Sequence, residues 1–212
     1  MSKRTVYFGY GSNLWRHQMR KRCPTSKYLG IARLKSYKWI IYDRGYANIV
    51  EIKDDEDKTI WKHDYRKEVW GLVYSLEPSD EARLDVNEGV PIAYTKEWIE
   101  CEFWPTSESN DDAFASEQFP NELESAKGKP DTSKEPKKVE MLVYINREGT
   151  DGDNDSKKEY IYRMNMGIKD ALKEGMPNEY VKQVLREYIP EREDEEVVEV
   201  AKRQALDFQD EN

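Results

Sequence analysis

The sequence predicts an α+β fold in which a mostly antiparallel sheet curls around a pocket. Runs of β-branched and aromatic residues follow one another with short breaks, a spacing that favours antiparallel pairing of neighbouring strands. Helical patterns then close the chain, at residues 158–173 and from Pro177 to Pro190. Strands followed by helices, without an internal repeat, are typical of the α+β class.

The first half of the chain is expected to hold several strands and one helix. Residues 5–10 (TVYFGY) are β-branched and aromatic, which predicts a short strand. Residues 14–23 predict a helix that ends at Pro24, with Ser12 or Asn13 as its N-cap. Three more strands are expected at 28–42, 46–52 and 68–76, and a charged loop at 54–67 precedes the last of them.

The second half alternates ordered segments with polar ones. Residues 78–87 predict a short helix with Ser79 as N-cap and Gly89 after its end. Residues 94–104 alternate polar and apolar side chains, the pattern of a half-exposed strand, and a further strand is expected at 139–145. Between them, residues 106–138 are rich in Ser, Asp, Glu, Pro and Lys and predict a long mobile insertion.

Length and composition favour one domain with a tail. The chain has 212 residues, of which 37% are apolar and 36% charged, so we expect one domain at 1–190. Its 14 Tyr, 6 Trp and 5 Phe supply large buried areas to a modest core. Residues 191–212 are charged and predict a C-terminal tail or a weakly docked helix.

Charge and cysteine content exclude several function classes. A net charge of −9 leaves no whole-chain basic surface for nucleic acid or anionic membrane, and the basic stretch 16–27 predicts a solvated helix face. Two cysteines, Cys23 and Cys101, and two histidines build neither a disulfide framework nor a zinc site. With no apolar leader and no long apolar run, we expect a cytoplasmic protein without metal, membrane or nucleic-acid partners.

A glycine turn is the most unusual feature of the sequence. In the segment 7–14 (YFGYGSNL), Gly9 and Gly11 lie where a strand gives way to a helix. Glycine lets a ligand approach main-chain amides closely, and a helix N-terminus adds orphan N–H donors, so a carboxylate or an oxyanion fits here. The third glycine of a dinucleotide fingerprint and the Lys of a Walker loop are both missing. From residue types alone, an ordinary tight turn remains the alternative.

Glu88 is the second candidate group. It lies between a predicted helix end and a strand, and its apolar neighbours Val86 and Val90 are expected to desolvate it partly. Desolvation raises the pKa of a glutamate and makes it a useful base near neutral pH. A surface glutamate at a helix end is the alternative, and we expect Asp85 to pair locally. A nucleophilic hydrolase would instead need Ser12 or Cys23 beside His17, without the usual elbow motif.

These segments together resemble the γ-glutamylcyclotransferase family. Residues 7–14 are similar to the family's Tyr-Gly-Ser-Asn signature. Further similar segments follow in the same order, together covering roughly residues 5 to 190 apart from the loops: 31–34 (IARL), 68–74 (EVWGLVY), 84–90 (LDVNEGV), Tyr94, Met166-Gly167 and 175–180 (GMPNEY). Several ordered segments are more specific than one short motif.

The resemblance implies a small, mixed barrel-like sheet with flanking helices, and an enzyme that releases 5-oxoproline from a γ-glutamyl substrate without cofactor or metal. It implies that Glu88 is the catalytic carboxylate. It also implies a set of substrate-binding residues: Tyr7, Phe8, Gly9, Tyr10, Gly11, Ser12, Asn13 and Tyr160.

Several alternatives stay open within this resemblance. The leaving half could be an amino acid, an amine, or the remainder of glutathione or of a glutathione conjugate. Asn13 and the context of Glu88 favour the branch that is not glutathione-specific. A non-catalytic binding module with the same fold is a further alternative, and the assembly is open, with a homodimer as one option.

Overall fold

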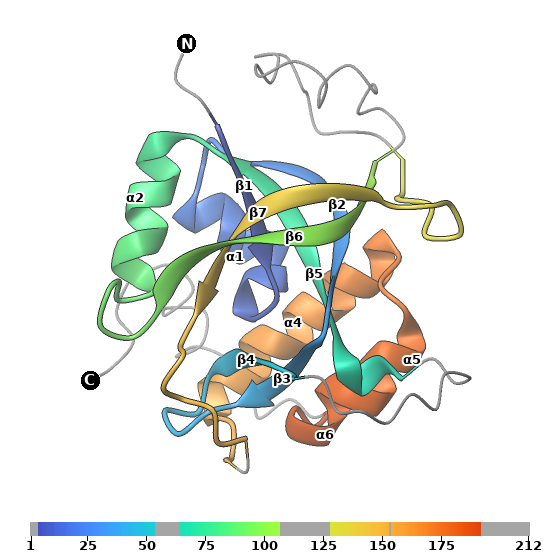
Figure 1. Cartoon of the computed structure of the whole chain (residues 1–212). Coiled ribbons are helices and arrows are strands. Elements are labelled where there is room, and N and C mark those ends of the chain that lie inside the picture. Colours follow the sequence, from blue (N-terminus) through green and yellow to red (C-terminus); the bar gives the residue numbers. More distant parts are fainter. Residues whose placement is uncertain (1–3, 54–63, 107–127, 153, 192–212) are drawn as a thin grey trace.

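The computed structural model describes residues 4–53, 64–106, 128–152 and 154–191. Within this part of the chain, five strands close into a barrel in the order β1-β5-β2-β6-β7 (Figure 1). The barrel strands are β1 (Thr5–Gly9), β2 (Lys27–Lys35), β5 (Glu68–Leu76), β6 (Thr95–Pro105) and β7 (Lys137–Ile145). The predicted α+β class, with a mostly antiparallel sheet curled into a small barrel and flanked by helices, is confirmed.

The barrel closes because β1 pairs with both β5 and β7. The pairing with β5 is antiparallel over the whole of β1, while the pairing with β7 is parallel and joins Tyr7 to Leu142. The other barrel pairs are antiparallel. β5 is buried along its full length, as expected for a strand with neighbours on both sides and packing on both faces.

Helices and one hairpin surround the barrel. In Figure 1, α2 lies at one side of the barrel, and α4 and the β3–β4 hairpin lie toward its lower end. The bounds of the elements outside the barrel are Ser12–Leu14 (η1), Arg16–Arg22 (α1), Tyr37–Ile41 (β3), Ala47–Glu51 (β4), Tyr65–Lys67 (η2), Pro78–Asn87 (α2), Lys158–Glu174 (α4), Asn178–Tyr180 (α5), Val181–Leu185 (η3, a π-helical segment) and Arg186–Tyr188 (α6).

Gly167 lets α4 pack directly on the turn that follows β1. A Cβ atom at position 167 would lie 2.8 Å from the Cβ of Leu14 and 3.0 Å from the backbone nitrogen of Trp15. Real side chains do not approach so closely, so a larger residue would push α4 outward. The close packing fixes the distance between α4 and the glycine turn.

Two predictions of local structure near the N-terminus were wrong. The predicted strand 28–42 is broken at Ser36, which has a φ of 61°, so that β2 joins the barrel and β3 pairs with β4 instead. The predicted helix 14–23 begins only at Arg16, after a 3-10 turn and an extended Trp15. Trp15 occupies its N-cap position without a side-chain bond, and neither Ser12 nor Asn13 does.

Two further differences concern element ends. α2 begins with Pro78 in its first turn and has Glu77 as its N-cap, two residues before the predicted cap Ser79. β7 begins at Lys137, inside the segment predicted as an insertion. The central part of that insertion, 107–127, lies outside the described residues, and so do 192–212 of the predicted tail.

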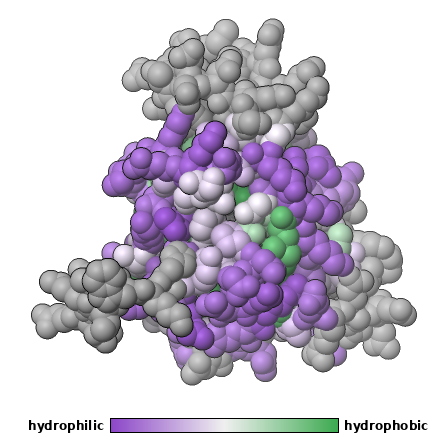
Figure 2. Space-filling model, turned by 90° about the vertical axis from the view of Figure 1, so that its right-hand side faces the viewer, coloured by the Kyte–Doolittle hydropathy of each residue, from purple (hydrophilic) through white to green (hydrophobic). Residues whose placement is uncertain are grey.

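The outer surface is largely hydrophilic. The face on the right of Figure 1 is mostly polar, with a small apolar area near its centre (Figure 2). In the described residues, no helix has the length and apolarity that crossing a bilayer requires.

Both cysteines are buried thiols, and burial raises the pKa of each to about 12. Because the thiolate is the reactive form, we expect neither Cys23 nor Cys101 to react with a disulfide reagent at about pH 8 while the protein is folded. In denaturant both should react at once. A thiol titration with and without denaturant measures this, and a thiol that reacts promptly in the folded protein would contradict the packing described above.

Candidate active site

A cavity of about 200 Å³ lies beside the turn that follows β1. Its wall is built by residues from distant parts of the sequence: the end of β1, the Ser12–Leu14 turn, the β3–β4 hairpin, the end of α2, β7 and α4. Of the predicted site residues, those that line it are Tyr7, Tyr10, Gly11, Ser12, Asn13, Glu88 and Tyr160.

The glycine turn is closed by its own backbone and approached by a tyrosine. The Leu14 amide donates to the Gly11 carbonyl at 2.9 Å. A Cβ atom at position 11 would lie 2.9 Å from the hydroxyl oxygen of Tyr160, so glycine is what allows this approach. The Tyr160 hydroxyl accepts a bond from the Ala47 amide at 3.3 Å and another from the Ser12 amide. Its own hydrogen is left to donate into the cavity.

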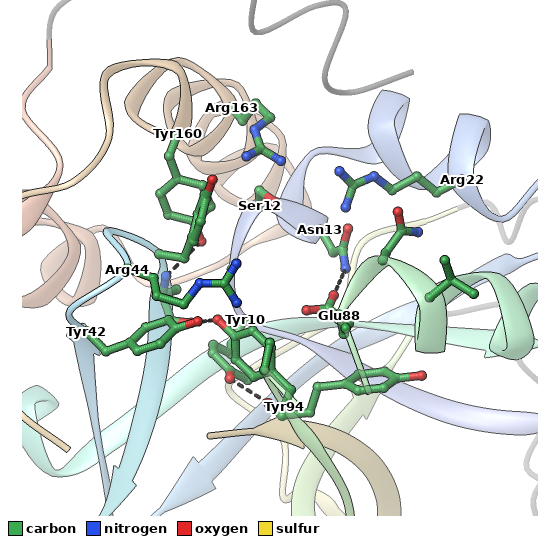
Figure 3. A pocket seen from close by; sticks show the side chains of 18 of the residues that line it. Tyr10, Ser12, Asn13, Arg22, Tyr42, Arg44, Glu88, Tyr94, Tyr160 and Arg163 are labelled. Atoms are coloured by element: carbon green, nitrogen blue, oxygen red, sulfur yellow. Dashed lines mark hydrogen bonds between the residues drawn. The ribbon is translucent and has the colours of Figure 1, made fainter. Parts of the chain in front are cut away.

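Glu88 reaches the same cavity from the end of α2. Its amide donates to the Leu84 carbonyl at 2.8 Å, and Gly89, with a φ of 62°, ends the helix directly after it. The Asn13 side-chain amide donates to Glu88 Oε1 at 3.2 Å (Figure 3). The carboxylate and the glycine turn therefore share one cavity.

Glu88 is partly buried, but the prediction that Val86 helps to desolvate it is wrong. The Val86 side chain is 70% exposed, so it removes little water from the carboxylate. Asn13 bonds to the carboxylate, and Tyr7 and Tyr94 line the same cavity.

A hydrogen-bond network holds Asn13 in place. Its Nδ2 donates to the Tyr7 hydroxyl at 2.9 Å as well as to Glu88. Gln18 Nε2 donates to Asn13 Oδ1 and to Ser12 Oγ, both at 3.0 Å. The Tyr74 hydroxyl donates to the Asn13 carbonyl at 3.2 Å. Every polar group of this asparagine side chain is thus used to fix its direction.

A second network fixes the end of α2. The Tyr144 hydroxyl donates to Asp85 Oδ1 at 2.7 Å, and Lys96 Nζ donates to Asp85 Oδ2 at 3.1 Å. Lys96 also forms an ion pair with Glu81. The expected local pairing of Asp85 is therefore wrong: its side-chain partners lie on other elements, and it ties the last turns of α2 to β6 and β7.

The tyrosines of the cavity are held neutral. Burial raises the pKa of Tyr7 and of Tyr10 well above the usual value, and the nearby negative charge of Glu88 raises each further. Burial also raises the pKa of Tyr160, while the Arg163 guanidinium acts in the opposite direction. These phenols consequently remain neutral hydrogen-bond donors across the neutral pH range.

Two predicted substrate-binding residues do not line the cavity. Phe8 is fully buried in the barrel core, and Gly9 is the last residue of β1. Their positions fit a role in supporting the glycine turn rather than in contacting a ligand. The cavity also contains residues that the sequence analysis did not single out in this role: Arg22, Tyr42, Arg44, Tyr46, Tyr94, Tyr144 and Arg163. Tyr94 belongs to the segments that carry the resemblance but was given no role there, and the others lie in no motif, so only the folded chain brings them together.

The geometry is unfavourable for a nucleophilic hydrolase. The Cys23 sulfur is buried and contacts the Asp80 carbonyl oxygen at 3.7 Å. His17 is exposed and its ring packs beside Trp15, with 5.3 Å between ring centroids. Ser12 Oγ accepts its bond from Gln18 rather than from a histidine.

A second, larger cavity of about 660 Å³ lies beside α1. Its only acidic residue among the described lining residues is Glu77, which is ion-paired with Arg4. The larger cavity therefore lacks the combination of carboxylate and glycine turn. In the described part of the chain, no group of three or more His, Cys, Asp or Glu side chains is arranged to hold a metal ion.

Comparison with known proteins places the chain in a family. A sequence model of the family described as "Gamma-glutamyl cyclotransferase, AIG2-like" matches residues 7–161, which contain β1, the glycine turn, Glu88 and Tyr160. The chain belongs to this family. The part of the chain that matches is also the part that supplies nearly all of the cavity wall.

Relatives support the family and the fold. A bovine gamma-glutamylcyclotransferase is 32% identical over 95 residues, which are 40% of this chain and 44% of that protein, so the match spans less than half of each. A solved structure of a gamma-glutamyl cyclotransferase matches with a TM-score of 0.57 at 19% identity, covering 94% of this chain and 99% of the other. An uncharacterized human protein matches with the same TM-score at 20% identity, covering 95% and 99%.

The raised tyrosine pKa values predict a loss of stability in alkali. Because the folded state keeps phenolic protons that the unfolded chain releases near its pKa of about 10, the melting temperature should fall as pH rises above about 10. Melting curves between about pH 8 and about pH 11 measure this. The Tyr10→Phe variant, which removes one such phenol, should show a shallower fall. A melting temperature that is constant over this range would contradict the buried, neutral state of these side chains.

Proposed function

We propose that this protein is a γ-glutamylcyclotransferase that releases 5-oxoproline from a γ-glutamyl compound. One observation carries the proposal: Glu88 and the glycine turn line the same cavity, and Asn13 bonds directly to the carboxylate at 3.2 Å. A proton acceptor is thereby held beside hydrogen-bond donors that can receive a developing negative charge. No cofactor or metal enters the proposed reaction.

The reaction begins with a proton transfer. The α-ammonium group of the substrate has a reference pKa of about 7.7–8.0 and cannot attack while it is protonated. The Glu88 carboxylate takes this proton. The amine nitrogen then attacks the γ-carbonyl carbon of the same molecule and closes a five-membered ring, a step favoured by the proximity of the two groups.

The negative charge that develops on the carbonyl oxygen needs donors. The Tyr160 hydroxyl is suited to this task because the Ser12 and Ala47 amides already donate to its oxygen, so its hydrogen points elsewhere. The bonds that it accepts also make the hydroxyl a better donor. We assign the oxyanion to the Tyr160 hydroxyl.

The reaction ends with the loss of the leaving amine. The bond between the γ-carbonyl carbon and the leaving nitrogen breaks, and the electron pair goes to that nitrogen. Protonated Glu88 returns its proton to the same atom. The products are 5-oxoproline and a free amine, and the carboxylate is restored for the next cycle.

The direct test is an assay of 5-oxoproline release from γ-glutamyl-alanine, glutathione and a γ-glutamyl amine. Release from at least one of them is expected. The relative rates of release from the three compounds distinguish the glutathione-specific and the γ-glutamylamine alternatives. Binding of all three without release would favour a non-catalytic module, and that result would contradict the proposal.

The Glu88→Gln variant should lose 5-oxoproline release by about 10³-fold or more while it keeps its melting temperature and still binds substrate, because the amide has nearly the same shape but cannot accept the proton. Steady-state kinetics with calorimetric binding measure both properties. Glu148→Gln, an exposed change of the same type outside the cavity, is the matched control and should behave as wild type. Turnover of Glu88→Gln near the wild-type rate would remove Glu88 from the mechanism.

The Asn13→Leu variant tests the positioning of the carboxylate. It keeps most of the side-chain volume but removes the bonds to Tyr7 and Glu88. We expect kcat to fall by about 10- to 100-fold with a smaller change in KM, since the loss of fixed geometry affects the reaction more than binding. A changed pH profile of kcat would show that Asn13 acts through Glu88. An unchanged kcat would contradict this role.

A further inference from the structure

The cavity carries a positive charge that the proton transfer does not require. Among the described residues that line it, three are arginines and one is acidic, so the wall has a formal excess of two positive charges. The chain as a whole has a net charge of −9. The excess is therefore local, and it favours anionic ligands in this cavity.

The three guanidinium groups approach the cavity from different elements. Arg22 comes from α1, Arg44 from the turn between β3 and β4, and Arg163 from α4. Figure 3 shows all three pointing toward the middle of the cavity, with the Glu88 carboxylate directed into the same space. Because they come from separate elements, they can contact separate groups of one ligand.

Two of these arginines are buried, which is unusual for a guanidinium. Arg163 is 2% exposed and Arg22 is 7% exposed. The Arg163 guanidinium lies 5.3 Å from the ring centroid of Tyr160 and 6.0 Å from that of Tyr46, in positions where aromatic faces stabilise a cation. Each of the two also has a partner within the chain, and each forms part of the cavity wall.

The proposed reaction assigns the three arginines to different parts of the substrate. The α-amine must lie at Glu88, and the α-carboxylate is attached to the same carbon atom. Arg22 stands on the side of Asn13 and Glu88, so it faces that carboxylate (Figure 3). Arg44 and Arg163 stand on the side of Tyr160 (Figure 3). Because the proposed reaction holds the γ-carbonyl oxygen at Tyr160, the leaving half, which is attached to the same carbon atom, lies on this side as well.

We infer that Arg44 and Arg163 are specificity-determining residues that select a leaving amino acid with two carboxylates. The inference rests on the proposed function. An α-carboxylate lies one carbon from the leaving nitrogen and reaches the deeper Arg163. A side-chain carboxylate lies farther out and reaches Arg44, which is exposed at the hairpin. Each guanidinium can bind a carboxylate through two parallel hydrogen bonds.

The charges of such a substrate match the cavity. A γ-glutamyl derivative of an acidic amino acid carries three carboxylates and one ammonium group. Its net charge of about −2 at neutral pH follows from the reference pKa values, and the described residues of the wall carry an excess of two positive charges. The products are 5-oxoproline and the free acidic amino acid. The proton transfers, ring closure and bond cleavage are the same as in the proposed reaction.

The test compares γ-glutamyl-glutamate with γ-glutamyl-glutamine, which has nearly the same shape but lacks the distal charge. We expect kcat/KM to be about 10-fold or more higher for the glutamate compound, since a charge-assisted bond is worth that much. In Arg44→Gln this preference should shrink to about twofold or less. Arg66→Gln removes an exposed arginine outside the cavity and should keep the wild-type preference.

A binding measurement tests this inference separately from the proposed function. Calorimetry with Glu88→Gln measures the affinity for both compounds without turnover, and the glutamate compound should bind about 10-fold more tightly. Equal affinities, equal kcat/KM values in the wild type, or an undiminished preference in Arg44→Gln would each overturn the inference. If γ-glutamyl-alanine, glutathione, the γ-glutamyl amine and both test compounds all release no 5-oxoproline, the proposed function fails, and the affinities still decide whether the arginines select a second carboxylate.

Discussion

The candidate site depends on the direction of one amide side chain. Asn13 donates to the Tyr7 hydroxyl at 2.9 Å and to Glu88 at 3.2 Å, and it accepts from Gln18 at 3.0 Å. These bonds tie the turn after β1, the first helix and the end of α2 into one wall. A carboxylate and an oxyanion pocket must be positioned within a fraction of an ångström for efficient proton transfer, and a fully bonded asparagine supplies that rigidity.

Neutral donors and fixed cations surround Glu88, the one carboxylate among the described residues of this wall. The close packing of Gly167 on Leu14 brings α4 against the turn, so that Tyr160 reaches the Ser12 amide and Arg163 reaches the cavity. Burial keeps the phenols protonated, and the arginines favour anions. The arrangement suits a substrate that is zwitterionic at one end and anionic at the other, with one group able to move a proton.

The sequence predicted the fold class and most elements because strand and helix periodicities are strong here. It failed where no local signal exists: Ser36 breaks the predicted strand 28–42 with no Gly or Pro at the break, since tertiary contacts hold its backbone. The motif located the turn and Glu88, whose catalytic role stays a prediction. Arg44 and Arg163 were missed because they lie about 120 residues apart and meet only through the pairing of β3 with β4 and the docking of α4.

A crystal structure of Glu88→Gln with an uncleaved γ-glutamyl dipeptide tests the central claim most directly. We expect the α-amine nitrogen within about 2.6–3.2 Å of the side chain at position 88, and the γ-carbonyl oxygen at a similar distance from the Tyr160 hydroxyl. A ligand whose amine faces away from position 88, or one that occupies the larger cavity beside α1 instead, would contradict it.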